Sequence, residues 1–443
     1  MEKIAVIGTG YVGLVSGTCF AEVGNQVTCC DIDQKKIENL LNGIMPIYEP
    51  GLEELVQKNI KKGKLTFTSH IAEAISQANI ILITVGTPMT SSGEADLSYV
   101  KKVAQMIGEN INCYKIIVTK STVPVGTGKL IESIIKKYAN EQPFDMVSNP
   151  EFLREGAAIN DTFQMERAVI GATSSHAIEI ISKLHLPFTN EMVKTNLETA
   201  ELIKYAANAF LATKISFIND IANICERVGA DVTKVSKAMG LDSRIGHKFL
   251  QAGVGFGGSC FPKDTAALLQ MAKSAGYDFK LMESVMNTNE GQRIHLIDKV
   301  VSVLGSLKGK NISVLGLAFK PNTNDIRSSP ALDIIPRLVE MGAMVKAYDP
   351  VATNEAKKQL SYPCIYSDDV YQTIKGTDAC VILTDWKEIK ELDLIEVKKL
   401  LHIPIIVDGR NLYDLDMMHK LGFTYISIGR PDVHMKSMTN HAI

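Results

Sequence analysis

Ten residues near the start of the chain predict its architecture, and they read Ile4-Ala5-Val6-Ile7-Gly8-Thr9-Gly10-Tyr11-Val12-Gly13. The apolar residues are typical of a short buried strand, and a helix is predicted from Leu14 to Val23. The pattern Gly-x-Gly-x-x-Gly between a strand and a helix is typical of a turn that binds a dinucleotide. This pattern alone is a weak signal, and the residues that follow give it weight.

A second strand, Val27 to Cys30, ends in Asp31, close to the spacing of about 20 residues at which a carboxylate binds the adenosine ribose. Because an acid at this point prefers a free 2′-hydroxyl to a 2′-phosphate, NAD is favoured over NADP. Lys36 can reach the same ribose or phosphate, although a solvated surface lysine is the commoner role. The predicted NAD contacts from this region are Gly8, Gly10, Tyr11, Val12, Gly13, Asp31 and Lys36.

Further strands are predicted at 80–85, 115–119 and 145–148, separated by helices in the order of a doubly wound parallel sheet. Ligands collect at the carboxyl ends of such strands, where the chain carries Gly86-Thr87-Pro88, Ser121-Thr122-Val123-Pro124 and Asn149-Pro150-Glu151. Thr87 and Thr122 are explained equally well as turn caps. A helical turn after Pro150 would place Glu151 and Glu155 on one face, where like charges repel, so the pair has less reason to exist as plain surface.

The segment from Asn196 to Val228 contains no glycine or proline and continues in helical period. A helix of about thirty residues spans about 45 Å, which is enough to join domains. Lys204 and Asn208 are one turn apart on it and predict an oxyanion or hydroxyl site, although two polar residues on a solvent stripe fit the periodicity as well. The opposite apolar stripe predicts a homodimer formed by burying it against a second copy.

A reactive thiol is predicted in Gly253-Val254-Gly255-Phe256-Gly257-Gly258-Ser259-Cys260-Phe261-Pro262-Lys263-Asp264. Its four glycines permit left-handed backbone and close approach to a ligand. A helix beginning near Pro262 places Cys260 at a helix N-terminus, which together with Lys263 favours the thiolate. Asp264 can act there as a base or orient a water. The alternative is a buried structural cysteine. Before this loop, Arg244 is a candidate anion contact.

The C-terminal half restarts the strand pattern at Lys310–Gly316, and Val345–Pro350 resembles the second strand of a nucleotide-binding unit. Strands at 379–383 and 405–407 are predicted to complete an open sheet. Gly316-Leu317-Ala318-Phe319-Lys320-Pro321 replaces the glycine fingerprint, so a phosphate there would meet side-chain cations such as Arg327. The predicted fold is two Rossmann-like doubly wound α/β domains joined by a long central helix and a helical middle domain. The predicted boundaries are 1–195 (NAD-binding), 196–305 (middle), 306–430 (C-terminal) and 431–443 (polar tail).

Composition excludes several classes of protein. The net charge of −2 over 443 residues gives no global field for nucleic acid or an anionic membrane. The N-terminus enters a strand without a signal-peptide pattern, and no apolar run reaches the length of a membrane span, so a cytoplasmic protein is expected. None of the eight cysteines forms a Cys-x-x-Cys pair, so reduced thiols and no metal site are expected.

These motifs together resemble the nucleotide-sugar dehydrogenases over nearly the whole chain. The residues that carry the resemblance are the fingerprint, Lys120-Ser121-Thr122-Val123-Pro124, Asn149-Pro150-Glu151-Phe152-Leu153, Lys204 to Asn208, the thiol segment and Gly316 to Lys320. Arg244-Ile245-Gly246 with Lys248-Phe249-Leu250 is similar to the UDP-glucose branch. The resemblance implies NAD in the N-terminal domain, a UDP-sugar between the middle helix and the C-terminal domain, and a dimer through the long helix.

The resemblance also implies roles for single residues in an oxidation of UDP-glucose to the acid. Cys260 is the nucleophile, and Lys204, Asn208 and Asp264 surround the reacting carbon, while Thr122 and Glu151 hold or activate the hydrolytic water. Thr87, Thr122, Glu155, Lys263 and Arg327 are implied cofactor contacts. The implied substrate contacts are Glu151, Phe152, Leu153, Arg154, Glu155, Lys204, Asn208, Phe249, Leu250, Gln251, Ala252, Gly253, Gly257, Lys320 and Arg410, with Arg244 supplied to a neighbouring subunit.

Three alternatives stay open. The first keeps the mechanism but acts on GDP-mannose or a UDP-N-acetylhexosamine. The second is a two-electron hydroxyacid dehydrogenase in which Lys204 and Asn208 act while Cys260 only packs. The third is a non-catalytic protein that binds NAD, which the many polar residues at the strand ends disfavour.

Overall fold

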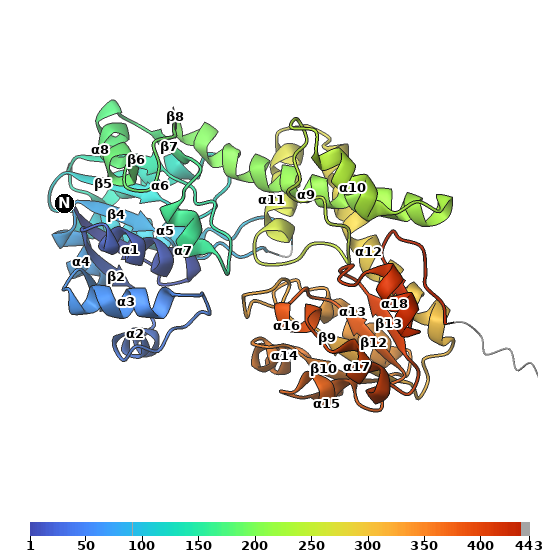
Figure 1. Cartoon of the computed structure of the whole chain (residues 1–443). Coiled ribbons are helices and arrows are strands. Elements are labelled where there is room, and N and C mark those ends of the chain that lie inside the picture. Colours follow the sequence, from blue (N-terminus) through green and yellow to red (C-terminus); the bar gives the residue numbers. More distant parts are fainter. Residues whose placement is uncertain (91, 436–443) are drawn as a thin grey trace, which may run out of the picture. The chain divides into compact units, whose positions relative to one another are not determined.

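The computed structural model describes residues 1–90 and 92–435. Contacts within the chain divide it into two compact units, each with its own sheet (Figure 1). The first unit comprises Met1–Ala207 and Ala266–Tyr277, and the second comprises Asn208–Thr265 and the chain from Asp278 onward. The segment predicted as a middle domain, 196–305, is thereby shared between the two units.

The first unit contains an eight-stranded sheet in the order β3-β2-β1-β4-β5-β6-β7-β8, and neighbouring strands are parallel except β6 and β7. Its strands are β1 (Lys3–Ile7), β2 (Gln26–Cys30), β3 (Leu65–Thr68), β4 (Ile80–Ile83), β5 (Lys115–Thr119), β6 (Phe144–Ser148), β7 (Ala168–Ala172) and β8 (Met192–Thr195). Its helices are α1 (Tyr11–Glu22), α2 (Gln34–Leu41), α3 (Leu52–Lys61), α4 (Ile71–Gln77), α5 (Ser98–Asn110), α6 (Thr127–Tyr138), α7 (Ala158–Phe163) and α8 (Ser175–His185).

Successive residues of the central strands feed two separate cores, one on each face of this sheet. In β1, Ile4 and Val6 pack with α1, α3, α7 and α8, whereas Ala5 and Ile7 pack with α4, α5 and α6. Because side chains alternate along a strand, a strand that is apolar throughout must be covered on both faces. The predicted doubly wound sheet is confirmed.

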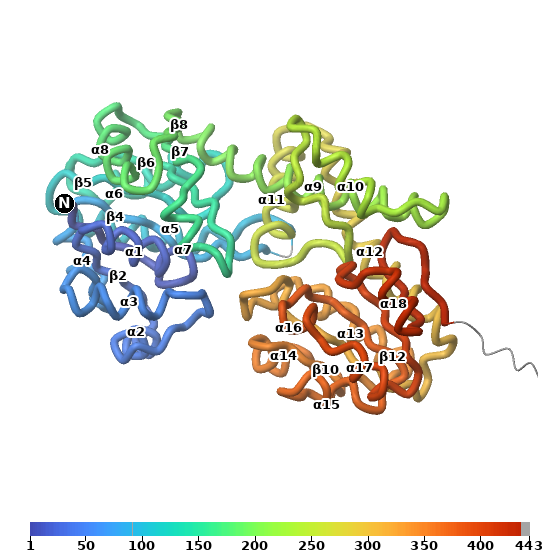
Figure 2. Tube along the Cα trace, viewed as in Figure 1, coloured from blue at the N-terminus to red at the C-terminus, as the bar shows by residue number. Residues whose placement is uncertain are grey.

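The second unit contains a six-stranded, fully parallel sheet in the order β11-β10-β9-β12-β13-β14, and Figure 2 lets the chain be followed through it. Its strands are β9 (Asn311–Leu315), β10 (Met344–Tyr348), β11 (Cys364–Tyr366), β12 (Ala379–Ile382), β13 (Ile405–Asp408) and β14 (Thr424–Ser427). Its complete helices are α10 (Val232–Gly240), α12 (Lys280–Leu304), α13 (Ala331–Glu340), α14 (Thr353–Gln359), α15 (Val370–Ile374), α16 (Lys387–Lys390), α17 (Leu394–Leu400) and α18 (Leu415–Leu421).

Two helices have residues in both units, namely α9 (Leu197–Val228) and α11 (Phe261–Ser274). α9 has 32 residues and no break, as its lack of glycine and proline predicts. α11 begins at Phe261 and Gly276 follows its end with φ of 75°, so the predicted helix after Cys260 is confirmed.

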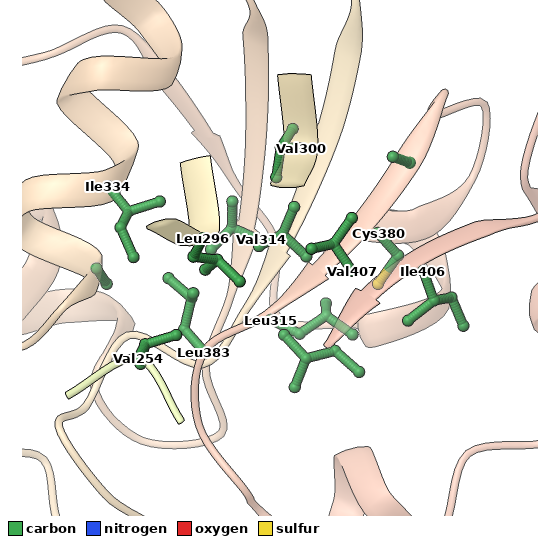
Figure 3. Close-up of a cluster of buried hydrophobic side chains, with 14 of the residues drawn as sticks. Val254, Leu296, Val300, Val314, Leu315, Ile334, Cys380, Leu383, Ile406 and Val407 are labelled. Atoms are coloured by element: carbon green, nitrogen blue, oxygen red, sulfur yellow. The ribbon is translucent and has the colours of Figure 1, made fainter. Parts of the chain in front are cut away.

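One apolar cluster holds the second unit together. Figure 3 shows Val254 of the thiol segment in the same cluster as Leu296 and Val300 of α12 and Val314, Val407 and Ile406 of the sheet. Burying a valine or leucine side chain contributes about 1.5–3 kcal/mol. The segment that carries Cys260 is therefore anchored by the core of the unit.

The predicted tail, 431–443, is only partly described. Val433 pairs with Tyr425 through two backbone hydrogen bonds of 2.8 and 3.0 Å. The remainder of the predicted tail, 436–443, lies outside the described residues.

Candidate functional site

The glycine fingerprint leaves room for a ligand at one position only. A Cβ at Gly8, where φ is 104°, would lie 2.9 Å from the Thr84 carbonyl oxygen, and one at Gly13 would lie 1.9 Å from the Gly8 oxygen. A Cβ at Gly10 would meet nothing within 4 Å. Gly10 is also the N-cap of α1 and supplies no capping side chain, so the N–H groups of that helix end suit the pyrophosphate of a dinucleotide.

Asp31 follows β2 and faces the fingerprint. Its Oδ2 accepts hydrogen bonds from Thr9 N at 3.0 Å, Thr9 Oγ1 at 2.7 Å and Lys36 Nζ at 2.7 Å. Burial alone would raise the pKa of Asp31, but the hydrogen bonds from Lys36 and Thr9 outweigh burial and hold the pKa below its usual value. Asp31 is thus an ionised acceptor beside the fingerprint, as ribose binding requires.

An open cavity of 520 Å³ lies beside this carboxylate. Ile32, which directly follows Asp31, lines it together with Ser69, Ile71 and Met106. Gln34, His70 and Glu73 also line the cavity, so its walls are mixed. The apolar side chains among them suit the flat adenine ring of a dinucleotide. The fingerprint, the carboxylate and the cavity therefore fit NAD.

Tyr11, a predicted NAD contact, has its hydroxyl turned to a buried carboxylate that the sequence did not indicate. Tyr11 Oη donates to Glu49 Oε2, and Glu49 also accepts from Gly156 N at 2.6 Å and from Ala158 N at 2.8 Å. Burial, and then the hydrogen bond to Glu49, raises the pKa of Tyr11. Glu49 thereby ties the fingerprint helix to the loop that contains Glu155. No sequence signal pointed to it, because its partners are 38 and 107 residues away.

The ends of β4, β5 and β6 come together, as parallel strands require. Thr87 Oγ1 donates to the Thr122 carbonyl oxygen at 2.8 Å, so Thr87 joins the turns after β4 and β5. Lys120 is buried after β5, and its Nζ lies 2.8 Å from Asn149 Oδ1 after β6. Thr122 and Glu151 follow these two residues along the chain.

Glu151, Lys204 and Phe152 form a compact group. Lys204 Nζ lies 3.4 Å from Glu151 Oε1, and both side chains are buried. The same ammonium lies 5.2 Å from the centre of the Phe152 ring, whose face Arg167 also covers at 4.0 Å. A lysine and a carboxylate held together in a buried place can stabilise an oxyanion and accept a proton.

The helical turn considered after Pro150 does not form, so Glu151 and Glu155 do not share a helical face. Residues 151–154 are irregular and α7 begins only at Ala158. Local hydrogen bonds explain the difference, because Glu151 Oε2 accepts from Leu153 N at 2.5 Å and Glu49 binds the Gly156 and Ala158 N–H groups. Arg154 is exposed and pairs with Asp161.

Glu201 is a second buried carboxylate that the sequence did not single out. It accepts from Gly126 N at 2.7 Å and Gly128 N at 2.6 Å, at the N-terminus of α6. Burial raises the pKa of Glu201 to about 7, although the two N–H groups oppose the shift. Glu201 connects α9, one turn before Lys204, with the helix that follows Thr122.

In the second unit, Asp264 joins Asn208 and Lys263. Asn208 Nδ2 donates to Asp264 Oδ2 at 2.6 Å, and Lys263 Nζ donates to Asp264 Oδ1 at 2.5 Å. Asp264 is 1% exposed, so both bonds form away from water. Cys260 directly precedes α11, and its Sγ lies 3.5 Å from Ser259 Oγ. Among the eight cysteines, Cys260 is neither fully buried nor fully exposed, so a ligand can reach it at a helix N-terminus.

The glycines of the thiol segment are required mainly by packing within the second unit. Gly255 and Gly258 have φ of 91° and 87°, as predicted, but Gly253 and Gly257 do not adopt left-handed backbone. A Cβ on Gly253 would lie 2.8 Å from the Gly409 oxygen, and one on Gly257 would lie 2.3 Å from the Ser328 oxygen. These two glycines thus allow the thiol segment to pack closely against the loops that contain Gly409 and Ser328.

Polar side chains of α9 and α12 hold this segment in register. Asn219 Oδ1 accepts from Gly253 N at 2.8 Å, and Asn289 bonds both the N–H and the carbonyl of Phe256, at 2.6 and 3.1 Å. Phe249, at the start of the predicted substrate loop, has φ of 66°, and the loop residues Leu250 and Ala252 are buried. A left-handed phenylalanine is strained and persists only where its surroundings fix it.

The predicted cations of the second unit lie in different surroundings. Arg410 is half-buried and donates to the Leu383 and Phe319 carbonyl oxygens at 2.7 and 3.3 Å, and loss of hydration lowers its pKa. Arg327 pairs with Asp325, Arg244 pairs with Asp242, and Lys320 lies 5.3 Å from the Phe319 ring centre. Arg410 therefore supports the loops at the sheet edge, whereas Arg327 and Arg244 are exposed side chains.

The described residues contain no cluster of three or more histidine, cysteine, aspartate or glutamate side chains that can hold a metal ion. No helix within 1–90 and 92–435 is both long enough and apolar enough to cross a bilayer.

The fingerprint, the ionised acid after β2 and the doubly wound sheet define an α/β dinucleotide-binding protein. Three segments match known families of domains: residues 2–189 match an NAD binding domain, 198–291 a central domain and 313–415 a UDP binding domain, all of the UDP-glucose/GDP-mannose dehydrogenase family. The chain belongs to this family, and its cofactor is NAD.

Individual relatives match nearly end to end. UDP-glucose 6-dehydrogenase TuaD of Bacillus subtilis (strain 168) is 66% identical over 434 residues, covering 98% of this chain and 94% of that protein. The structure of a UDP-glucose dehydrogenase from the hyperthermophilic archaeon Pyrobaculum islandicum superposes with a TM-score of 0.89, 37% identity and coverage of 93% and 95%. A UDP-D-ManNAc dehydrogenase from Pyrococcus horikoshii gives a TM-score of 0.85 at 28% identity, covering 96% and 99%.

Proposed function

We propose that the chain oxidises UDP-glucose at C6 to UDP-glucuronate and reduces two NAD for each sugar. The observation that carries this choice of substrate is the 66% identity to a UDP-glucose 6-dehydrogenase over nearly the full length of both chains. The chemistry is supported by an accessible thiol at a helix N-terminus and by buried lysine, amide and carboxylate groups on α9, α11 and the loop after β6.

Cys260 makes a four-electron oxidation possible on one protein. When bound, NAD takes up the hydride of each oxidation. The first oxidation turns the primary alcohol into an aldehyde, and the Cys260 thiolate adds to its carbonyl carbon to give a thiohemiacetal. Loss of a second hydride from that carbon leaves a thioester, and water then releases the carboxylate and restores the thiol. The hydrolysis makes the sequence effectively irreversible.

The remaining proposed roles follow from charge and hydrogen-bonding capacity. Lys204 and Asn208, one turn apart on α9, stabilise the oxyanion that develops at each stage, and losing one such donor typically costs about 100- to 1000-fold in rate. Glu151, beside Lys204, accepts the proton of the hydrolytic water, which Thr122 helps to hold. Asp264 orients Asn208.

We propose that the cations of the second unit and of the loop after β6 serve the diphosphates of the two ligands. Arg244, Lys320 and Arg154 fit the UDP-sugar, and Lys263 and Arg327 fit NAD. The carboxylate of Glu155 is a further proposed NAD contact, away from the phosphates. Arg410 acts through the carbonyl groups that it holds. A nucleotide that binds Arg244, Arg154 or Arg327 competes with the carboxylate partner that each has in the structure.

A homodimer through α9 is part of the proposal. Phe210, Phe217, Ile224 and Val228 lie at helical spacing on α9 and are 66%, 47%, 52% and 69% exposed in the single chain. Burying such a stripe against a second copy removes it from water, which favours association. Light scattering should give twice the chain mass, and Phe217→Glu should lower it towards one chain.

We propose a location in the cytoplasm, a reducing compartment, because none of the eight cysteines belongs to a Cys-x-x-Cys pair.

The deciding experiment counts NADH released from limiting UDP-glucose. The wild type should release two NADH per sugar and form the acid, whereas Cys260→Ser should lose acid formation. Cys113→Ser is the matched control, because Cys113 is an exposed cysteine that belongs to none of the motifs. A yield of one NADH per sugar, or full-rate acid formation by Cys260→Ser, would contradict the proposal. A panel with GDP-mannose and UDP-N-acetylhexosamines tests the choice of sugar.

A further inference from the structure

Lys120 is a buried cation to which nothing above assigns a chemical role. It is 4% exposed and directly follows β5. Its Nζ lies 2.8 Å from Asn149 Oδ1 and 3.4 Å from the Asn149 carbonyl oxygen. Asn149 is itself fixed, because its Nδ2 donates to the Val169 oxygen on β7 at 2.8 Å. Burying an ammonium group costs free energy unless it is paired or hydrogen-bonded.

The place of this contact in the sequence connects it to the proposed water-holding residues. Lys120 comes two residues before Thr122, and Asn149 comes two residues before Glu151. The bond between Lys120 and Asn149 therefore fixes the ends of β5 and β6 relative to each other, at the points from which Thr122 and Glu151 extend. Burial lowers the pKa of Lys120 to about 8, and the charge of Glu151 opposes this shift. The charge of Glu151 thus favours the ammonium form of Lys120.

We propose that Lys120 is a positioning residue for thioester hydrolysis, which holds Glu151 in place beside the hydrolytic water. This inference rests on the proposed function. In the step, Glu151 takes one proton from water as the water oxygen bonds to the thioester carbonyl carbon. The carbon–sulfur bond then breaks with its electron pair on the sulfur of Cys260. No electrons are exchanged with NAD in this step, so Lys120 matters after both oxidations are complete.

Lys115 at the other end of β5 provides a matched control. It is also fully buried, and its Nζ donates to the carbonyl oxygens of Ala78 at 2.6 Å and Ser76 at 3.1 Å. Its partners are these two carbonyl oxygens and the Cys113 sulfur at 3.6 Å, all at the amino ends of the strands and away from Thr122 and Glu151 in the sheet register. Replacing either lysine by methionine removes a buried ammonium from one end of β5, Lys115 from its start and Lys120 from just after its last residue.

The experiment measures the covalent adduct on Cys260 after rapid quenching of the full chain mixed with UDP-glucose and NAD. Intact-mass spectrometry quantifies the adduct, and absorbance follows NADH. Lys120→Met should accumulate the thioester and slow hydrolysis by about 10- to 100-fold, with a burst of NADH before a slow steady state. Lys115→Met should show no more adduct than the wild type. Glu151→Gln, which lacks the base, should accumulate the adduct and serves as the positive control.

The outcomes separate this inference from the proposed function. Adduct in Glu151→Gln but no excess in Lys120→Met over Lys115→Met overturns the positioning role and leaves the proposed function intact. Absence of adduct in every variant, Glu151→Gln included, overturns both. If Lys120→Met does not fold, Asn149→Ala, which removes the side-chain acceptor and keeps the lysine, replaces it. Adduct accumulation in Asn149→Ala supports the inference, and its absence overturns it.

Discussion

The sheets of the two units begin with nearly the same backbone. In the first, Gly8 has φ of 104° and its N–H donates to the Cys30 carbonyl oxygen at 2.8 Å; in the second, Gly316 has φ of 96° and donates to the Tyr348 oxygen at 2.8 Å. Each second strand is followed directly by an aspartate, Asp31 after β2 and Asp349 after β10. The two units thus share the strand pair, the glycine turn and the aspartate. They differ in the groups that Asp31 and Asp349 bind.

The carboxylate oxygens of Asp349 accept hydrogen bonds from groups inside the protein. It is 3% exposed, and the structure gives it five donors. These are Leu317 N at 2.7 Å, Ala318 N at 2.9 Å, Val351 N at 3.0 Å, Ala352 N at 2.8 Å and Trp386 Nε1 at 3.1 Å. Two of these donors, Leu317 N and Ala318 N, belong to the turn after β9, which corresponds to the fingerprint turn after β1 in the first unit. In the second unit, Asp349 therefore holds the turn after β9 in place through these hydrogen bonds.

Asp31 holds its turn through Thr9 alone and keeps contact with solvent. Its side chain is 11% exposed, with the exposed Ile32 and the open cavity next to it. The same topology thus yields a dinucleotide site where the acid is left accessible, and a structural anchor where a tryptophan and four backbone N–H groups surround it. Topology predicts where a ligand can bind, and the neighbours of the acid decide whether one does.

The largest expected effect is on stability. Asp349→Ala leaves buried donors without an acceptor, at about 1–3 kcal/mol for each that stays unpaired, so we expect a loss of at least about 3–5 kcal/mol in the free energy of unfolding. Asp31→Ala should cost about 1 kcal/mol, because its site is partly open. Trp386 is the only tryptophan of the chain and contacts Asp349, so its fluorescence in a urea titration reports the second unit. Equal losses in the two variants would contradict the comparison.

The next effect is on cofactor affinity. Asp31→Ala removes a charged acceptor from the ribose, which is worth about 1.5–3 kcal/mol, so the KM for NAD should rise about 10- to 150-fold. The KM for UDP-glucose should change little, and NADP should become a better competitor because a repulsive charge is gone. Steady-state kinetics with each substrate varied in turn measures all three quantities. A KM for NAD within twofold of the wild type would show that Asp31, like Asp349, is structural.

The strands that sequence patterns predicted are the central ones. β1, β2, β4, β5 and β6, and in the second unit β9, β10, β12 and β13, are apolar runs because both of their faces are covered. The four edge strands β3, β8, β11 and β14 were not predicted. An edge strand such as β8, with exposed Val193 and Lys194, carries no continuous apolar run. β7 was also missed, and it pairs antiparallel with β6 and contains Gly171.

Site residues divide in a similar way. Cys260, Asp264, Lys204 and Asn208 were predicted because they lie in local patterns, a glycine-rich helix entry and one helical turn. Glu49 and the partnership of Lys120 with Asn149 depend on contacts between residues distant in sequence, which no local pattern encodes. The boundaries 195, 305 and 430 and the individual site roles stay predictions.

Two carboxylates on α9, the buried Glu201 and the half-buried Glu226, extend the comparison of the units to pH. Glu201, in the first unit, has a pKa raised to about 7 by burial. For Glu226, in the second unit, burial acts in the same direction, but hydrogen bonds from His295, Gly429 N and Lys299, at 2.8, 2.7 and 2.9 Å, outweigh it and lower the pKa to about 2. On the same helix, the surroundings of Glu201 therefore disfavour its ionised form, whereas those of Glu226 favour its ionised form.

The smallest expected effect follows from the signs of these shifts. Because the pKa of Glu201 is higher in the folded state, its contribution to stability is fully present below about 4.5 and is lost as pH rises through about 7. The contribution of Glu226 is present above about 4.5 and is lost as pH falls through about 2. The Tm of the wild type relative to Glu201→Gln should therefore fall by about a few degrees between pH 5 and 7.5, measured by calorimetry. The Tm of the wild type relative to Glu226→Gln should stay level between pH 5 and 7.5 and fall only in stronger acid. If the Tm of Glu201→Gln changes with pH as the wild-type Tm does, Glu201 does not titrate in this range.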